Sequence, residues 1–375
     1  MACSRARRAV LLMAPSALFA LLLAGVEAGT RLALPRVESL DVFVINPQQQ
    51  AQFVDKRKVR VFEGDPLLFW RLLPNLRGVA WERTPVTTNP QGLRYTSPVG
   101  RKPRGVFRIV CLGDSVTFGF QVPRMHADGS WNRDPEARAY PALLEEWLRE
   151  ANPGRAIEVV PLACPGYSSH QGLAWLRRDI SWLEPDVVTV LFGWNDICRR
   201  NVSDAEAMPT AWPKVAARGV VSRSQVLLHL RRWLSGRGFA RRGPAEGWKL
   251  RMRVSRDEYV LNLMAIARLA RDHGARPVLL GPVYRDRDSY PPEGEDIAGH
   301  REALAAAAAI EGIPYVAFPE LTEAAWPENR PLFSEHIHPN GRGHRLLAEE
   351  LLRFFAARGL LDGLAVPVAA VGPAS

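Results

Sequence analysis

Residues 106–115 are Val106-Phe107-Arg108-Ile109-Val110-Cys111-Leu112-Gly113-Asp114-Ser115, and this stretch decides the fold. A buried parallel strand has a near-continuous apolar sequence because helices cover both faces of its sheet. Ligands of open α/β sheets bind beyond the carboxyl ends of such strands. Gly113 permits a tight exit from the strand, and Ser115 then offers its hydroxyl and its backbone N–H at the sheet edge. Gly-Asp-Ser alone is also typical of an ordinary helix cap, so its meaning depends on the rest of the chain.

A candidate base and a candidate carboxylate for Ser115 lie far downstream, in Glu335-His336-Ile337-His338-Pro339-Asn340-Gly341. A serine hydroxyl is a poor nucleophile at neutral pH, so it needs a general base, which in turn needs an orienting carboxylate. His338 and Glu335 supply these two residue types. They are three residues apart, so their side chains can reach the same side of a turn.

Two further apolar runs, residues 159–164 and 187–192, end just before candidate donors for an oxyanion. Gly166 offers an unobstructed backbone N–H, and Asn195 offers a side-chain amide. Together with the Ser115 N–H, these groups would form an oxyanion hole. Each residue alone is typical of a turn or a loop cap. Their occurrence at three successive strand ends indicates a site for acyl chemistry.

The periodicity of the chain predicts an α/β fold with a parallel sheet. Strand-like runs occupy residues 106–112, 157–163, 186–192, 276–281 and 313–318, and they alternate with helical patterns. The helical patterns cover residues 173–183, 257–273 and 300–311, and a closing helix follows Asn340. We expect one catalytic domain with a sizeable core.

On these residues the chain resembles the SGNH, or GDSL-type, hydrolase superfamily, of a membrane-anchored bacterial type, over roughly residues 104–360. The resemblance implies a three-layer α/β/α, flavodoxin-like fold with a central, mostly parallel five-stranded sheet. It also implies that Ser115 is the nucleophile, that His338 is the base, and that Ser115, Gly166 and Asn195 form the oxyanion hole. The chain has no Gly-x-Ser-x-Gly elbow, which argues against the α/β-hydrolase alternative.

The carboxylate departs from the family pattern, which has Asp three residues before the histidine where this chain has Glu335. Glutamate is one methylene longer. It must therefore fold back to reach the imidazole of His338, or leave a water or a backbone carbonyl to orient the ring.

The resemblance implies a serine esterase that cleaves an acyl ester, such as an acetyl ester on a carbohydrate, through an acyl-enzyme. An O-acyltransferase that moves an acyl group onto a cell-envelope polysaccharide would use the same residues. A carbohydrate-binding or assembly protein with a vestigial site is a third interpretation. None of the three requires a cofactor.

The N-terminus predicts a membrane anchor or a signal peptide within residues 1–30. Arg5, Arg7 and Arg8 precede an uncharged run, Ala9–Val26, which is close to the length that crosses a bilayer. Basic residues ahead of a span stay in the cytoplasm, so we expect an inner-membrane anchor and a periplasmic catalytic domain. Cleavage in the small-residue segment Val26-Glu27-Ala28 would instead give a secreted protein.

The remaining chain divides by composition. Residues 31–104 carry several prolines and scattered aromatic residues, which predicts short strands and turns packed on the core. Residues 105–362 form the expected hydrolase domain, and residues 363–375 a flexible tail.

The formal charge of +10 is concentrated in a basic insertion at residues 199–256, which contains twelve Arg and two Lys but only three acidic residues. We therefore expect no nucleic-acid partner. Within the insertion, Val226, Leu227, Leu230, Trp233 and Leu234 suggest a basic amphipathic helix. Such a helix could meet an anionic membrane surface or an anionic polysaccharide, or its apolar face could pack on the protein.

Cysteine and histidine residues add two alternatives. Cys164 and Cys198 flank the oxyanion segments and could pair in an oxidising compartment. His336, His338 and His344 cluster in sequence, but no acidic or cysteine ligands accompany them at metal-site spacing, so we expect no metal.

Overall fold

The computed structural model describes residues 2–38, 60–124, 137–200, 202–208, 211–241, 251–288 and 293–367. The chain forms two compact units, each described separately below. The first comprises Met1–Gln52, Phe62–Arg71 and Pro209–Trp248, and the second comprises Phe53–Val61, Leu72–Met208 and Lys249–Ser375.

The second unit is built on a five-stranded parallel sheet with the strand order β11-β10-β7-β5-β6. Its strands are β5 (Phe107–Gly113), β6 (Ile157–Ala163), β7 (Val187–Leu191), β10 (Arg276–Leu280) and β11 (Tyr315–Val316). The predicted parallel sheet is therefore confirmed. Strand β11 is shorter than the predicted 313–318, because Phe318 has a positive φ of 50° and Pro319 begins a 3₁₀ turn.

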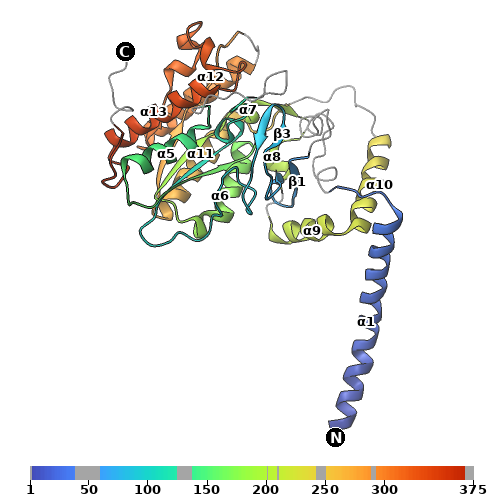
Figure 1. The fold of residues 1–375 in the computed structure, drawn as a ribbon. Coiled ribbons are helices and arrows are strands. Elements are labelled where there is room, and N and C mark those ends of the chain that lie inside the picture. The colour runs from blue at the N-terminus through green and yellow to red at the C-terminus, as the bar shows by residue number, and fades with distance from the viewer. Residues whose placement is uncertain are drawn as a thin grey trace. The chain divides into compact units, whose positions relative to one another are not determined.

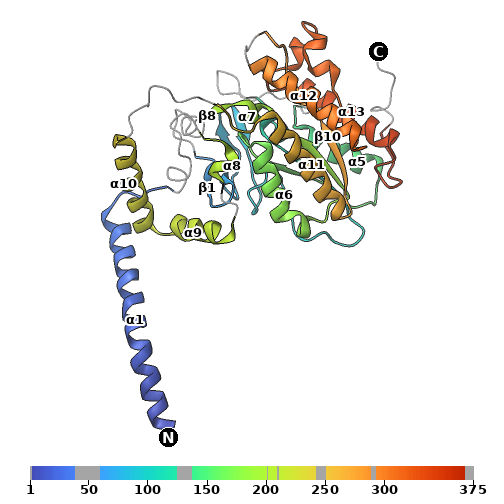
Figure 2. The ribbon, with the colours of Figure 1, turned by 180° about the vertical axis from the view of Figure 1, so that it is seen from behind.

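Helices cover both faces of this sheet, as Figures 1 and 2 show from opposite sides. Helices α5 (Tyr140–Ala151) and α13 (Gly341–Ala357) share a core cluster with Ile109 and Cys111 of β5. Because side chains alternate along a strand, Val110 and Leu112 face the other way. Helix α6 (Ser169–Leu183) packs on α11 (Arg256–Asp272), which contacts β10 and α12 (Glu293–Ile310). The expected three-layer α/β/α arrangement is confirmed.

Helix caps explain where several of these helices begin. Ser168 and Gln171 form a capping box at the start of α6, and Ser255 and Glu258 form another at the start of α11. The Asn340 side chain accepts hydrogen bonds from the first backbone N–H groups of α13.

Short elements complete the second unit. They are β3 (Val79–Trp81), β4 (Thr84–Val86), α4 (Ser115–Phe118), α7 (Trp194–Ile197), β8 (Arg199–Arg200), α8 (Asp204–Ala207), β9 (Arg251–Met252), η1 (Pro319–Leu321), η2 (Glu323–Ala325) and η3 (Arg330–Leu332). Strand β8 pairs antiparallel with β9, so the two ends of the basic insertion lie side by side.

The register of β5, β6 and β7 aligns their carboxyl ends. Gly113, the last residue of β5, lies opposite Ala163 of β6 and Leu191 of β7. The segments that follow these strands therefore leave the sheet at the same edge.

The first unit contains α1 (Ala2–Ala33), β1 (Phe62–Asp65), α9 (Trp212–Arg223) and α10 (Gln225–Arg241), with β2 (Phe69–Leu72) paired to β1. Pro15–Ala33 is long and apolar enough to cross a membrane. In α10, Leu228 is buried against Val37, whereas Leu230 and Trp233 of the predicted apolar stripe are exposed. The buried face of α10 is thus set by Leu228, which lies outside that stripe.

Candidate active site

Ser115 is the first residue of α4, directly beyond the end of β5. Asp114 caps α4 by accepting a hydrogen bond from the Val116 N–H at 2.9 Å. The tight exit requires glycine at position 113, because a Cβ there would lie 2.8 Å from the Leu191 carbonyl oxygen. As the first helical residue, Ser115 has no acceptor for its N–H within α4.

The structure brings His338 and Glu335 to Ser115. His338 Nε2 lies 2.8 Å from Ser115 Oγ, and His338 Nδ1 contacts Glu335 Oε1. Glu335 Oε1 also accepts the His338 backbone N–H at 2.9 Å. The longer side chain thus folds back onto the loop and reaches the imidazole directly.

Glu335 is held ionised by its neighbours. Burial favours the neutral acid, but hydrogen bonds from His336 and His338 outweigh it and hold the pKa of Glu335 well below its usual range. His336 Nδ1 lies 2.9 Å from Glu335 Oε2, so the carboxylate serves both histidines.

Gly166 lies at the third position of a tight turn formed by Cys164-Pro165-Gly166-Tyr167. The Tyr167 N–H donates to the Cys164 carbonyl at 3.2 Å, and Gly166 has a φ of 83°. Proline second and a positive φ third are the signature of a type II turn. The middle peptide of a type II turn is rotated by about half a turn relative to type I. The Pro-Gly sequence therefore fixes the direction in which the Gly166 N–H points.

Asn195 lies in α7, just after β7, and its amide contacts Asp114, the N-cap of α4. Asn195 Nδ2 donates to Asp114 Oδ2 at 3.2 Å. A side-chain NH₂ has two hydrogens, so this contact leaves one for a ligand. Burial raises the pKa of Asp114 to about 6, although the Val116 N–H, His338 and Asn195 all favour the carboxylate.

Aromatic rings border His338 on one side. The ring of Phe120 lies 4.7 Å from the His338 ring, and Trp81 of β3 packs edge-on against Phe120 at 5.4 Å. The strand pair before β5 thus supplies one wall beside His338. Sequence patterns did not single out this role for Phe120 or Trp81.

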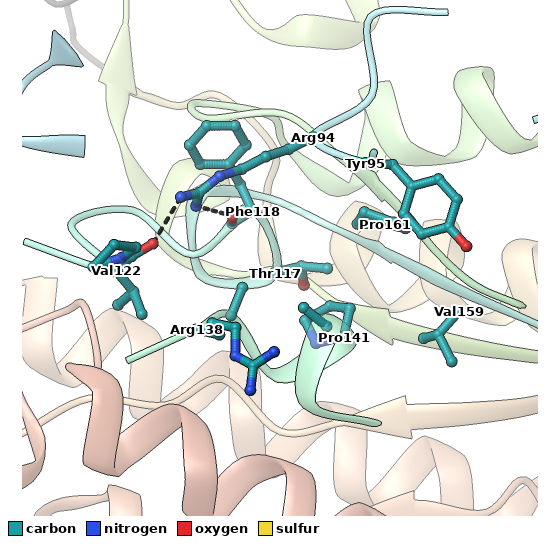
Figure 3. A pocket seen from close by; sticks show the side chains of 12 residues that line it. Arg94, Tyr95, Thr117, Phe118, Val122, Arg138, Pro141, Val159 and Pro161 are labelled. Atoms are coloured by element: carbon teal, nitrogen blue, oxygen red, sulfur yellow. Dashed lines mark hydrogen bonds between the residues drawn. The ribbon is translucent and has the colours of Figure 1, made fainter. Parts of the chain in front are cut away.

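A cavity of about 130 Å³ lies beside α4 (Figure 3). It is lined by Arg94, Tyr95, Thr117, Phe118, Val122, Pro123, Arg138, Ala139, Pro141, Ala142, Val159 and Pro161. The lining includes none of the five predicted site residues. Arg94 donates to the carbonyl oxygens of Phe118 at 2.7 Å, Gly119 at 2.6 Å and Val122 at 2.7 Å, and thereby shapes the chain after α4.

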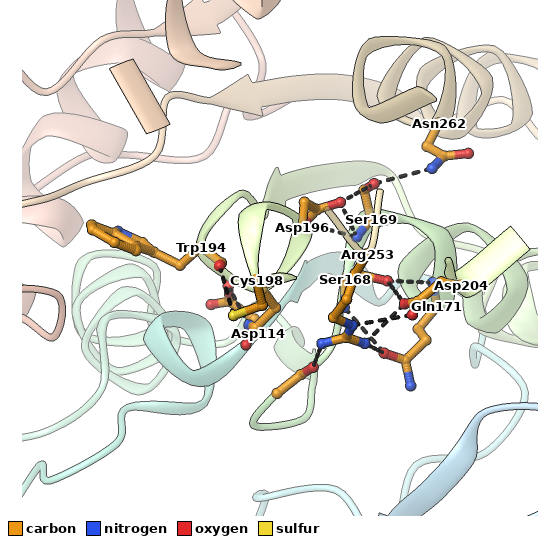
Figure 4. Close-up of polar contacts among 12 residues, drawn as sticks. Asp114, Ser168, Ser169, Gln171, Trp194, Asp196, Cys198, Asp204, Arg253 and Asn262 are labelled. Atoms are coloured by element: carbon orange, nitrogen blue, oxygen red, sulfur yellow. Dashed lines mark hydrogen bonds and ion pairs between the residues drawn. The ribbon is translucent and has the colours of Figure 1, made fainter. Parts of the chain in front are cut away.

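A buried polar network lies behind the oxyanion segments (Figure 4). Ser169 donates to Asp196 from its backbone N–H at 3.0 Å and from its hydroxyl at 2.5 Å. Burial raises the pKa of Asp196 to about 7, against these hydrogen bonds. The Arg253 guanidinium joins Asp204 to the Gly166 turn. Sequence reasoning missed Arg253, because nothing in its local sequence separates it from the other arginines of the insertion.

The structure also shows the surroundings of Cys164, Cys198 and His344. Cys164 and Cys198 do not form the suggested disulfide bond, and Cys198 Sγ instead donates to the Trp194 carbonyl at 3.4 Å. His344 is a core residue that accepts the Tyr140 N–H, and burial lowers its pKa to about 3.

Comparison with known proteins gives partial relatives. Isoamyl acetate-hydrolyzing esterase of Saccharomyces cerevisiae (strain ATCC 204508 / S288c) is 27% identical over 112 residues, which are 26% of this chain and 46% of the relative. The chain thus spans less than half the length of that protein.

Solved structures with similar folds are more distant. LAE5, an α/β hydrolase enzyme from the metagenome of Lake Arreo, Spain, is 20% identical, with a TM-score of 0.43, over 68% of this chain and 96% of its own. Axe2, an acetylxylan esterase from Geobacillus stearothermophilus, is 16% identical, also with a TM-score of 0.43, over 66% and 93%.

The family described as GDSL-like Lipase/Acylhydrolase matches residues 111–346. This range begins within β5 and ends within α13. It covers well over half of the chain and includes Ser115, Gly166, Asn195 and His338. The resemblance seen in the sequence motifs is confirmed, and the chain belongs to the GDSL-like lipase/acylhydrolase family.

Proposed function

We propose that this protein is a serine esterase that hydrolyses a short acyl ester through an acyl-enzyme. The observation that carries the proposal is the 2.8 Å contact between Ser115 Oγ and His338 Nε2, with ionised Glu335 behind the imidazole. This is the arrangement of nucleophile, base and orienting carboxylate that activates a hydroxyl.

In the first half-reaction, Ser115 Oγ attacks the ester carbonyl carbon while His338 Nε2 takes the hydroxyl proton. The negative oxygen that forms is held by the Ser115 N–H, the Gly166 N–H and the free hydrogen of Asn195 Nδ2. The tetrahedral intermediate collapses, the C–O bond to the alcohol breaks, and His338 returns the proton to the departing alkoxide.

In the second half-reaction, water takes the place of the alcohol. His338 removes a proton from the water as its oxygen attacks the acyl carbon. The ester bond to Ser115 Oγ then breaks, and the serine recovers the proton from His338. A sugar hydroxyl in place of water would give acyl transfer.

An acetyl group is our proposed acyl group. The yeast relative is named for hydrolysing an acetate ester, and its similarity to this chain is the support for this choice.

The test uses the full-length protein in detergent with p-nitrophenyl acetate, butyrate and octanoate. We expect turnover that is highest with acetate, and a loss of at least about 10³-fold in kcat for Ser115→Ala and His338→Ala. A glycan acceptor in a parallel reaction identifies transfer by acylated sugar in the product. Turnover that survives in Ser115→Ala, or no turnover of any ester by the wild type, would overturn the proposal.

We further propose that α1 is retained as a membrane anchor and holds the catalytic unit outside the cytoplasm. Glu27 caps the start of α10: it accepts hydrogen bonds from Ser224 Oγ at 2.8 Å, the Gln225 N–H at 2.8 Å and the Val226 N–H at 3.2 Å. A carboxylate at a helix N-terminus is favourable because it meets unpaired N–H groups and the positive end of the helix dipole. Cleavage after Ala28 would remove this cap.

The same unit presents aromatic and basic residues that suit an anionic lipid surface. Trp212 and Trp233 are 77% and 51% exposed, and Lys214 and Arg232 lie near them in sequence. Exposed tryptophans beside basic residues are typical of the membrane interface. We propose lipid headgroups as the partner of α9 and α10.

A further inference from the structure

Arg253 is almost fully buried, with 2% of its surface exposed, and all of its guanidinium nitrogens donate hydrogen bonds. Nη1 donates to the Gly166 carbonyl at 2.8 Å. Nη2 donates to Asp204 Oδ2 at 2.8 Å and to Gln171 Oε1 at 2.7 Å, and Nε donates to Asp204 Oδ1 at 3.1 Å. Figure 4 shows Arg253 with Asp204 and Gln171 beside its guanidinium.

The backbone around Arg253 is also held by hydrogen bonds. The Arg253 N–H donates to the Cys198 carbonyl at 2.8 Å, and the Arg253 carbonyl accepts the Asp204 N–H at 2.8 Å. The next residue, Val254, donates to the Asp196 carbonyl at 3.1 Å. Arg253 therefore joins the chain that follows Asn195 to the turn that contains Gly166.

The contact with the Gly166 carbonyl matters because of the geometry of the turn. The Gly166 N–H belongs to the middle peptide of the Cys164–Tyr167 turn, and the Gly166 carbonyl belongs to the next peptide. A change from type II to type I would rotate the middle peptide by about half a turn and would bring φ of Gly166 to negative values. The Gly166 carbonyl would stay in place during such a change, so the contact with Arg253 fixes the position of the turn, while the Pro-Gly sequence fixes its type.

We propose that Arg253 is a positioning residue of the oxyanion hole, which fixes the place of the Gly166 turn so that its N–H can reach the substrate. The proposal rests on the proposed function. Arginine suits this role because its planar fork reaches the carbonyl of Gly166, the amide of Gln171 and the carboxylate of Asp204 at once. Lysine carries one nitrogen and cannot span the same three groups.

The first test is Arg253→Lys in the full-length protein, assayed with p-nitrophenyl acetate. The charge that pairs with Asp204 is kept, and the hydrogen bond to Gly166 is lost. We expect kcat to fall about 10- to 30-fold with KM changed by less than about threefold, because an oxyanion contact acts in the transition state. The pH at the midpoint of the kcat/KM profile should stay the same, since Arg253 does not touch His338.

Two control variants separate positioning from stability. Arg251→Gln, two residues before Arg253, removes an exposed ion pair with Glu206, and its kcat should match the wild type. Asp204→Asn weakens the buried ion pair but keeps Arg253 on the Gly166 carbonyl. It should lower the melting temperature at least as much as Arg253→Lys and lower kcat less.

A double-mutant cycle with Gly166→Ala tests whether Arg253 affects kcat through Gly166. If Arg253 acts through Gly166, the double variant should be no more than about twofold slower than Gly166→Ala alone. Independent effects would multiply, and that result would overturn the proposal. If Arg253→Lys does not fold, Arg253→Gln with Asp204→Asn removes both charges and takes its place in the cycle.

Wild-type kcat in Arg253→Lys, or equal losses of kcat in Arg253→Lys and Asp204→Asn, would also overturn this role. Neither result would affect the esterase proposal, which fails only if Ser115→Ala retains turnover or the wild type has none.

Discussion

At the scale of single residues, Glu335 is the member of the site that departs from the family pattern. Its longer side chain reaches both the imidazole and the backbone N–H of His338, so one carboxylate oxygen orients the ring in two ways. Its second oxygen is committed to His336. With its extra methylene, the Glu335 carboxylate contacts both His336 and His338 and still reaches the imidazole of His338.

Replacement of Glu335 by Gln keeps an acceptor oxygen but removes the negative charge that stabilises the imidazolium. We expect kcat with p-nitrophenyl acetate to fall about 10²-fold, which is less than for His338→Ala, because the ring keeps its nitrogen base. Glu311→Gln, which removes a surface pairing with Arg268, is the matched control. A kcat for Glu335→Gln within twofold of the wild type would show that this carboxylate does not assist His338.

Asp114 predicts a pH dependence of stability. Its pKa is about 6 in the folded protein against 3.8 for the ordinary group, so the folded state binds the proton more tightly than the unfolded state. Its contribution to stability is therefore full below about pH 4 and is lost as the pH rises through about 6. Asp114→Asn keeps an acceptor for the Val116 N–H and removes this dependence.

Urea unfolding at pH 4 and pH 7.5 measures the effect. Relative to the wild type, Asp114→Asn should gain at most about 3 kcal/mol in free energy of unfolding between these two pH values. The same difference between variant and wild type at both pH values would contradict the raised pKa.

At the scale of elements, α4 is a helix of one turn, and it depends on Arg94. Burial lowers the pKa of Arg94 to about 10, so its guanidinium is still a cation at neutral pH. It donates to three carbonyl groups at and beyond the end of α4, and to the Pro85 carbonyl at 3.2 Å. The segment before β5 thereby holds the turn that begins with Ser115.

Arg94→Met fills similar space but leaves those carbonyl groups without a donor. We expect the free energy of unfolding to fall by about 3 kcal/mol, because each buried acceptor then loses a charge-assisted hydrogen bond. Urea unfolding checks this value. Arg101→Met removes an exposed ion pair with Glu184 and should change it by less than about 1 kcal/mol.

Much of this fold could be predicted from the sequence, for local physical reasons. Buried parallel strands have continuous apolar sequences, so all five sheet strands were located. Helix ends were less certain: α12 begins at Glu293, seven residues before the predicted start at 300, because an acidic first turn extends the helix ahead of its alanine-rich part.

The supporting residues could not be predicted, because their partners are distant in sequence. Arg94 contacts Gly119, 25 residues away, and Arg253 contacts Gly166, 87 residues away. Neither contact has a periodic signal, and the chain contains 49 basic residues from which to choose. Glu335 was identified as a candidate, but only the loop conformation shows that its side chain reaches the imidazole.

At the scale of the whole molecule, the basic insertion contributes to both units. Its helices α9 and α10 belong with α1, while its closing strand β9 and Arg253 belong with the sheet. Glu27 of α1 accepts hydrogen bonds from Ser224, Gln225 and Val226 at the start of α10, so these two helices are joined within the first unit.

If α1 is retained, the protein purified from membranes should carry residues ahead of Glu27 and should resist extraction with alkaline carbonate. Intact mass measurement tests this directly, and a soluble product that begins after Ala28 would contradict it. Glu27→Gln should raise the rate of proteolysis within α10 about fivefold, as expected for the loss of a helix cap worth about 1 kcal/mol. Glu38→Gln, at an exposed pairing with Arg36, is the control.

The candidate site residues come from two parts of the fold that should differ in resistance to heat. Ser115 and Asn195 follow β5 and β7 inside the sheet, and Gly166 follows β6 at its edge. Strands inside a sheet exchange their amide hydrogens only when a domain opens globally. His338 and Glu335 lie on a loop ahead of α13, where local opening needs far less energy. Warming should therefore separate His338 from Ser115 first, and the enzyme would lose its activity reversibly while its sheet is still intact.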